Sequence, residues 1–144
     1  MIGIIMNWLA YALLSALFAG LVAIFGKIGV REVDSTLATM VRSVVMAVAL
    51  VSLVLARGGI GDVKQITPRA WLFITLAGIA GAASWLCYFR ALQLGDAARV
   101  APIDKLSIVF VVIFAGIFLG EKISAGTMMG LLLVCGGAVL IARG

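Results

Sequence analysis

Four charged side chains lie inside long apolar stretches: Arg42, Arg90, Asp104 and Lys105. Counted along a helix, Arg42 lies about 11 Å from the nearer end of its segment and Arg90 about 8 Å. Asp104 and Lys105 lie about 12 to 14 Å from the start of theirs. If these segments cross a membrane in alternating directions, all four charges approach from the same side. We therefore predict one charged layer, of the kind that usually faces a partner or a water-filled cavity.

Each of these charges also has a simpler explanation. Arg and Lys side chains can extend to the membrane surface along their own stems, which fits the shallow Arg90 best. Asp104 is too short to do so and needs a cationic partner, for which Lys105, Arg42 and Arg90 are the candidates. Three cations and one anion leave a net charge of +2. A wet vestibule with this charge favours an anionic or zwitterionic solute.

Aromatic residues lie beside the charged layer. Trp85, Tyr88 and Phe89 are spaced three and four apart, so they share one helix face, with Ser84 next to them. This face is either an interfacial belt or packing surface, or the wall of a binding site. The predicted substrate pathway comprises Arg42, Ser84, Trp85, Tyr88, Arg90, Asp104, Lys105 and Ser107.

Pro102 lies close to Asp104 and Lys105 in the sequence. Proline has no backbone N–H, so it removes the helical hydrogen bond to the Ala98 carbonyl and bends the helix. Membrane helices tolerate such a bend where a cavity or a motion uses it. We predict a helix bend at Pro102.

The elements that carry these residues follow from composition. The chain has 144 residues, of which 65% are hydrophobic and 12% charged, and its mean hydropathy is +1.27. A soluble protein of this size has too little interior for so much apolar surface. The runs are long and unbroken, unlike the alternating strands of a membrane barrel. We predict an all-α integral membrane protein with helices at about 8–26, 35–56, 70–94, 97–120 and 124–142.

Helix ends are marked by capping residues. Gly95 is expected to end the third helix in a left-handed conformation, so that the third and fourth helices form a tight hairpin. Residues 1–7 contain no Lys or Arg, and no cleavage site follows, so we expect the first span to be retained. The expected N-caps are Asp34 or Ser35, Thr67 before Pro68, Asp96 and Ser124.

Small residues recur four apart in three of the predicted helices, a spacing that allows close helix contact in lipid. They serve packing within the chain or an interface between chains. The predicted helix-packing residues are Ala12, Ala16, Gly20, Gly116, Gly120, Gly126 and Gly130.

Several functional classes are disfavoured. The chain has no histidine, and we expect Cys87 and Cys135 to pack within spans, so neither a metal site nor a cofactor is expected. Asp104 is the one acidic residue deep in a span, which argues against an enzyme. Nothing resembles a nucleic-acid-binding module, so we expect no nucleic-acid partner.

The distribution of basic residues bears on orientation, because Lys and Arg accumulate on the cytoplasmic side. Outside the spans, each side of the membrane holds four Lys and Arg residues, so the signal is balanced. When Arg42, Arg90 and Lys105 within the spans are also counted, the second side holds seven and the first side four. Either one side is cytoplasmic, or the same chain inserts both ways and pairs with itself. The first side holds Arg57, Lys64, Arg69 and Lys122; the second holds Lys27, Arg31, Arg99 and Arg143.

The run WLCYFRALQLGDAARVAPIDKLSIVFVVIFAGIFLGEK resembles the second part of an EamA domain of the drug/metabolite transporter superfamily. The similar features are Tyr88 to Leu92, the segment from Ala97 to Pro102, Leu119-Gly120-Glu121, and a glycine-rich last helix. The resemblance covers the chain, 1–144, as one five-helix domain.

Most members of that family carry two such domains in inverted orientation around a central cavity. The resemblance therefore implies a secondary transporter of small metabolites, completed by an antiparallel homodimer in the inner membrane of a prokaryote. The alternative is an accessory subunit that pairs with another small membrane protein, for example in flipping a lipid-linked substrate.

Overall fold

The computed structural model describes residues 2–144, with side chains from Trp8 onward. This part of the chain is helical and contains no strand. Five of its helical stretches are long and apolar enough to cross a membrane, as the sequence predicted. They are Trp8–Gly29, Ser35–Ala56, Pro68–Leu94, Ala97–Leu119 and Ala125–Arg143.

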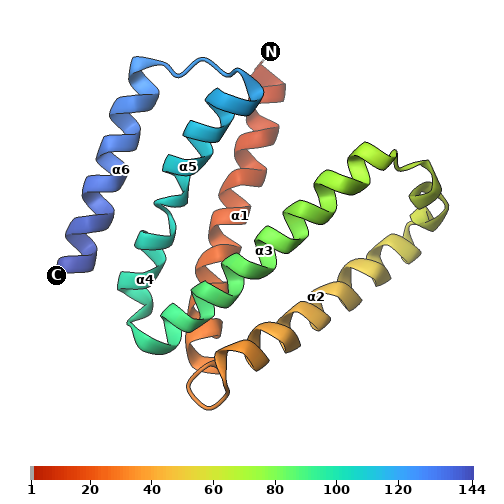
Figure 1. Ribbon diagram of the computed structural model, residues 1–144, viewed down its shortest axis with the longest axis horizontal. Helices are drawn as coiled ribbons and strands as arrows, with labels where there is room; N and C mark the ends of the chain where they lie inside the picture. Colours follow the sequence, from red (N-terminus) through yellow and green to blue (C-terminus); the bar gives the residue numbers. More distant parts are fainter. Residues whose placement is uncertain (1) are drawn as a thin grey trace. The chain divides into compact units, whose positions relative to one another are not determined.

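The chain divides into two compact units, each described by itself. One is Gly29–Gln93, which contains α2 (Ser35–Ala56), the 3-10 helix η1 (Gly59–Gln65) and nearly all of α3 (Pro68–Leu94). Figure 1 shows α2 and α3 running in opposite directions with η1 at the connection between them. Consequently the start of α2 and the end of α3 belong to the same end of this unit.

The starts of α2 and α3 confirm two of the predicted caps. The Asp34 carboxylate accepts hydrogen bonds from the backbone N–H groups of Thr36 and Leu37. Before α3, the Thr67 hydroxyl accepts from Ala70 N at 3.3 Å. Pro68 then occupies the first helical position, where no backbone N–H is needed.

The buried side chains of this unit gather at one end. They are Val30, Ser35, Thr39, Phe89 and Leu92, all close in sequence to the start of α2 or the end of α3. Helix ends that meet in this way fix the depth of neighbouring residues on the two helices relative to each other.

The other unit contains helix α1 (Ile2–Gly29), which belongs to it as far as Ile28, and the segment Leu94–Gly144. Its later helices are α4 (Ala97–Asp104), α5 (Ser107–Phe114), the π-helical turn η2 (Ala115–Leu119) and α6 (Ala125–Arg143). Helix α4 packs against α6. Ser124 caps α6 by accepting from Thr127 N at 3.0 Å, as predicted.

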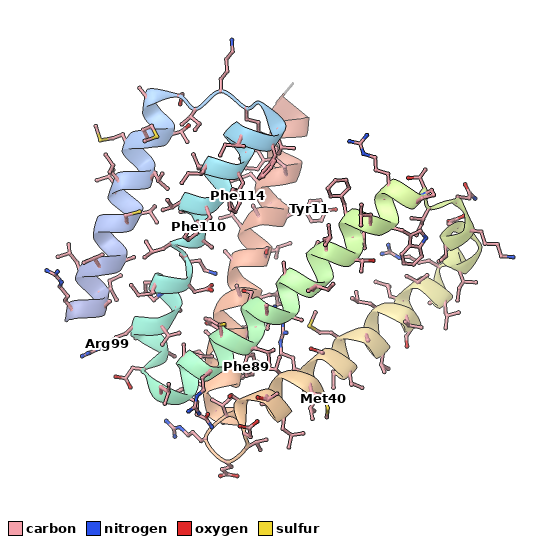
Figure 2. The ribbon with its side chains drawn as sticks, in the orientation of Figure 1. Tyr11, Met40, Phe89, Arg99, Phe110 and Phe114 are labelled. Carbon is pink, nitrogen blue, oxygen red and sulfur yellow. The ribbon has the colours of Figure 1, made fainter. Side chains whose placement is uncertain are left out.

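The ends of α4 and α6 are tied by Arg99. Its Nη2 donates to the Gly144 carbonyl at 3.2 Å, and Figure 2 shows Arg99 extending from α4. The guanidinium thus bonds the chain end beyond α6, where the last helical carbonyls have no helical partner.

The predicted turn between the third and fourth spans is wrong in detail. Gly95 is not left-handed, because among the described residues only Gly58 and Gly120 have a positive φ. Asp96 has an extended N-cap backbone, but its side chain makes no capping hydrogen bond. Instead the Gly95 carbonyl accepts a 2.7 Å bond from Lys27 Nζ, which joins the end of α1 to this turn.

The fourth span is not one continuous helix, in contrast to the predicted 97–120. It is interrupted at Lys105 and Leu106, between α4 and α5. It ends in η2, where Gly120 adopts φ 67° and the N–H of Glu121 reaches back to the Ala115 carbonyl at 3.2 Å. A positive φ suits glycine because it has no Cβ, so Gly120 ends this span.

Candidate functional site

The most unusual charged group in the spans is the guanidinium of Arg42 on α2. Its Cζ lies 3.5 Å from the centroid of the Trp85 ring and 5.9 Å from that of Phe89. Trp85 is in edge contact with Tyr88 at 5.5 Å, and all three rings touch one another. We call Arg42, Trp85, Tyr88 and Phe89 the Arg42 cluster; Figure 2 labels Phe89 on α3.

The antiparallel helices explain why these residues meet. Arg42 lies seven residues after the start of α2 and Trp85 nine residues before the end of α3. These steps correspond to about 11 Å and about 14 Å of helix, so the two side chains reach similar depth. A cation over the face of an aromatic ring is attracted by the ring quadrupole, most strongly for Trp.

Stacking on Trp85 lowers the cost of placing Arg42 in a membrane span but leaves its charge uncompensated. An Arg near the centre of a membrane helix costs about 2.5–3.5 kcal/mol on insertion scales, and a desolvated cation–π contact returns about 2 kcal/mol. Within its own unit, Gly29–Gln93, Arg42 forms no ion pair. The cluster therefore retains a positive charge.

Arg90 has a different environment from Arg42. Its Nη1 donates to Gln93 Oε1 at 2.6 Å, one turn nearer the end of α3, and the residue is exposed. This geometry favours the snorkelling explanation for Arg90. Gln93 in turn donates through Nε2 to the carbonyls of Val30 and Val33, each at 3.3 Å. Sequence reasoning missed Gln93, whose position one turn after an arginine was the available signal.

Asp34 lies just outside the second span and carries the cap of α2. Hydrogen bonds from the backbone N–H groups of Leu37 and Thr36 hold the pKa of the Asp34 carboxyl below its usual value of 3.8, with a small further contribution from Arg90. The ionised form of Asp34 is therefore favoured by the folded α2.

In the other unit, Asp104 and Lys105 pair with each other. Lys105 Nζ lies 3.2 Å from Asp104 Oδ2, and the side chains are 61% and 35% exposed within the chain. Lys105 is the one of the three candidate partners that lies in the same unit as Asp104, and the two form an ion pair. Arg42 and Arg90 belong to the first unit, so the single charged layer shared by all four remains a prediction.

The ion pair lies at the interruption of the fourth span. Lys105 N bonds the Pro102 carbonyl, and Leu106 N bonds the Ile103 carbonyl, each three residues back instead of four. Ile108 and Val109 repeat this tighter pattern. The change of geometry thus falls three to seven residues after Pro102.

The two predicted hydroxyl residues and most of the small residues are exposed within the chain. Ser84 and Ser107 are exposed, on α3 and at the start of α5. A Cβ placed on Gly20 or Gly130 would meet no described atom within 4 Å beyond its own helix backbone. A Cβ on Gly116 would reach Ile123 at 3.5 Å. Ala12 and Ala16 are exposed on α1, and a Cβ on Gly126 of α6 would lie 3.6 Å from Ser124 Oγ.

Comparison with known proteins identifies the family. The chain matches the EamA-like transporter family over residues 6–143. It is 50% identical over 136 residues to a Sinorhizobium protein described as an uncharacterized transporter in the cobO 3′ region, covering 94% of this chain and 96% of that protein. No solved structure gives a significant match.

A second relative is longer. The pseudopaline exporter CntI of Pseudomonas aeruginosa, in two strains, is 30% identical over 94 residues. The match covers 65% of this chain and 32% of that protein. The chain therefore belongs to the EamA-like transporter family, which makes it a multi-pass membrane protein of a bacterial transporter family and points away from an enzyme.

Proposed function

We propose that this chain is a secondary transporter of a small anionic or zwitterionic metabolite, located in the inner membrane of a prokaryote. Two copies inserted in opposite orientations form the working unit and expose the pathway to each side in turn. The observation that carries the proposal is the balance of basic residues outside the spans, four on each side. Such a balance gives insertion no strong preference for one orientation.

The size of the chain supports pairing. The Sinorhizobium relative is matched over nearly its full length, so a protein of this size recurs in the family. In CntI the 94 matched residues are 32% of the protein, which makes that exporter about twice as long as this chain. With an odd number of spans, a second copy fused in tandem would be inverted without an additional helix, so an inverted pair of such domains is also reached readily in longer proteins.

The small residues support an interface between chains. Gly20 and Gly130 have no described neighbour close to the position of a Cβ. Close helix contact in lipid depends on such small residues. We assign them, with Ala12, Ala16 and Gly126, to contact with the second copy.

The pathway in this proposal uses the polar residues inside the spans. Arg42 and the aromatic residues beside it bind the solute, and the Asp104–Lys105 pair at the interrupted span supplies a place where the helix can move. If Lys105→Ala and Asp104→Asn both leave solute flux in inside-out vesicles unchanged, the second of these roles is wrong.

Topology is the first experiment. Reporters that work on one side only, alkaline phosphatase outside and a fluorescent protein inside, are fused after Gly144. Both fusions should be active to similar extents. Activity of only one reporter would contradict dual insertion, and copurification of an unrelated small membrane protein would then support the accessory-subunit alternative.

Orientation-locked variants test the mechanism. Ile60→Lys with Gln65→Lys adds charge on one side, and Glu32→Lys with Val33→Lys adds it on the other. Each variant alone should show one active reporter and little flux of a labelled carboxylate and amino-acid panel. Co-expression of the two variants should restore flux. Full flux from either locked variant alone would refute the antiparallel pair.

A further inference from the structure

The guanidinium of Arg42 presents a face and an edge with different partners. The face stacks on Trp85 at 3.5 Å. The edge carries five N–H donors in a planar fork, and no hydrogen bond from Arg42 to a described residue occurs. Stacking therefore orients the fork without using its donors.

The nearby hydroxyls on α2 do not serve as acceptors that occupy this fork. Thr39 Oγ1 donates to the Ser35 carbonyl at 2.7 Å, and Ser43 Oγ donates to the Thr39 carbonyl at 2.8 Å. Both hydroxyls are thus turned along their own helix. Arg42 is also the one charged residue between Ser35 and Ala56, so α2 itself brings no anion to it.

The charge of the Arg42 cluster limits the charge of a ligand that it can bind. Arg42 on α2 contributes a single positive charge. The cation near the end of α3, Arg90, is bonded to Gln93. A monovalent carboxylate neutralises one guanidinium and matches its fork with two parallel hydrogen bonds. A divalent phosphate leaves excess negative charge inside a membrane span, which is costly.

The aromatic residues define the rest of the ligand. Trp85 and Tyr88 are half-buried, whereas Phe89, which contacts both rings, is 4% exposed. Aromatic faces favour flat apolar groups through offset or edge contacts.

We propose that the Arg42 cluster binds a monocarboxylate that carries a flat apolar group. The carboxylate is held by the Arg42 fork and the apolar group lies against Trp85 and Tyr88. This inference rests on the proposed transport function, for which it names the substrate class, but binding is measurable without transport.

Trp85 provides the readout. The chain has three tryptophans, so Trp8→Phe with Trp71→Phe leaves Trp85 as the single fluorophore in purified protein in nanodiscs. Titration with benzoate should change its emission saturably. Benzyl alcohol keeps the ring without the charge, acetate keeps the charge without the ring, and phenyl phosphate carries more charge. Each of these three should bind at least tenfold more weakly than benzoate.

Variants at Arg42 complete the test. In the single-tryptophan background Arg42→Gln should weaken benzoate binding roughly 10- to 150-fold, while circular dichroism shows an unchanged helical signal. Arg42→Lys keeps the charge but lacks the planar fork, so it should weaken benzoate binding several-fold. If Arg42→Gln fails to fold, Arg42→Lys and the ligand series still decide the question.

Three results would overturn the inference: an unchanged benzoate titration in Arg42→Gln, equal binding of benzyl alcohol, or equal or tighter binding of phenyl phosphate. Failure of the transport proposal is a separate result, seen as a single active reporter after Gly144 or as full flux from one locked variant. Saturable, Arg42-dependent benzoate binding in a protein of single orientation would keep the binding site and reject the antiparallel mechanism.

Discussion

The spans contain two charged regions, of which one keeps its charge and the other neutralises it. In the Arg42 cluster, a cation lies against Trp85 with its hydrogen-bond donors unused by described residues. In the fourth span, Asp104 and Lys105 are adjacent in sequence and form an ion pair at 3.2 Å. The first arrangement keeps a net charge that can attract a ligand. The second is already neutral, and it lies where the helix geometry is interrupted.

The difference shows that charge in a membrane span does not by itself mark a binding group. A neutral pair at an interruption suits a movable joint, because both charges stay compensated while the backbone changes. A stacked arginine suits recognition, because its ring partner orients the fork in advance and leaves less conformational entropy to lose on binding. The following predictions separate the two roles, beginning with the largest expected effect.

Asp104→Asn should produce the largest loss of stability. It leaves Lys105 uncompensated within a span, which costs about 2.5–3.5 kcal/mol on insertion scales. The expected result is a lower melting temperature and lower yield in membranes. The double variant Asp104→Asn with Lys105→Gln should recover most of the loss. No recovery would show that Asp104 has a role other than compensating Lys105.

Arg42→Gln should reduce transport rather than stability. Losing a hydrogen bond to a charged ligand costs about 1.5–3 kcal/mol, which is roughly a 10- to 150-fold loss of apparent affinity for benzoate in a vesicle flux assay. The melting temperature should stay level or rise, since an unpaired charge leaves the span. Arg90→Gln is the matched control, because it removes a cation on the same side of the membrane as Arg42 whose guanidinium is bonded to Gln93. An equal loss of flux in both variants would show that Arg42 has no special role in binding the solute.

Pro102→Ala should stabilise the fourth span by about 1 kcal/mol, since the new N–H can bond to the Ala98 carbonyl. Amide exchange at residues 105–109 should slow, and flux should fall if this interruption moves during transport. The chain has one other proline, and Pro68→Ala at the start of α3 removes no strain of this kind, so it serves as the control. Faster exchange at residues 105–109 in Pro102→Ala would contradict a link between Pro102 and the interruption that follows it.

Asp34 should give the smallest effect, confined to acidic pH. Because the folded pKa of Asp34 lies below its ordinary value, its contribution to stability is complete above that value and is lost as pH falls through the folded pKa. Thermal melts at about pH 6 and about pH 3 should differ more in the native chain than in Asp34→Asn, which caps α2 without titrating in this range. Equal pH dependence in the two proteins would show that the cap does not depend on charge.

Local features were predictable from the sequence because they depend on neighbours along the chain. Length and apolarity alone locate the five spans. The caps formed by Asp34, Thr67 and Ser124 need only a short polar side chain and backbone N–H groups two or three residues on. The pairing of Asp104 with Lys105 is likewise between adjacent residues.

Predictions failed where a distant residue or a change of helix geometry intervenes. Gly95 had the residue type of a left-handed cap, but its carbonyl is bonded by Lys27 from 68 positions earlier. The predicted continuous helix 97–120 is interrupted at Lys105 and Leu106 and ends in the π-helical turn η2. Neither outcome can be obtained from local spacing, because both depend on which groups the folded chain brings within reach.

The amino-acid sequence by itself determined that this is a five-span membrane protein with charges inside its spans, because burial of apolar length in lipid follows from composition. Only the tertiary structure decided which charge is compensated and which is not. Arg42 and Trp85 are 43 positions apart in the sequence, and they meet because α2 and α3 run in opposite directions with their ends matched. The register of that helix pair depends on packing. It places the Arg42 guanidinium against the Trp85 ring and thereby makes Arg42 a candidate binding group.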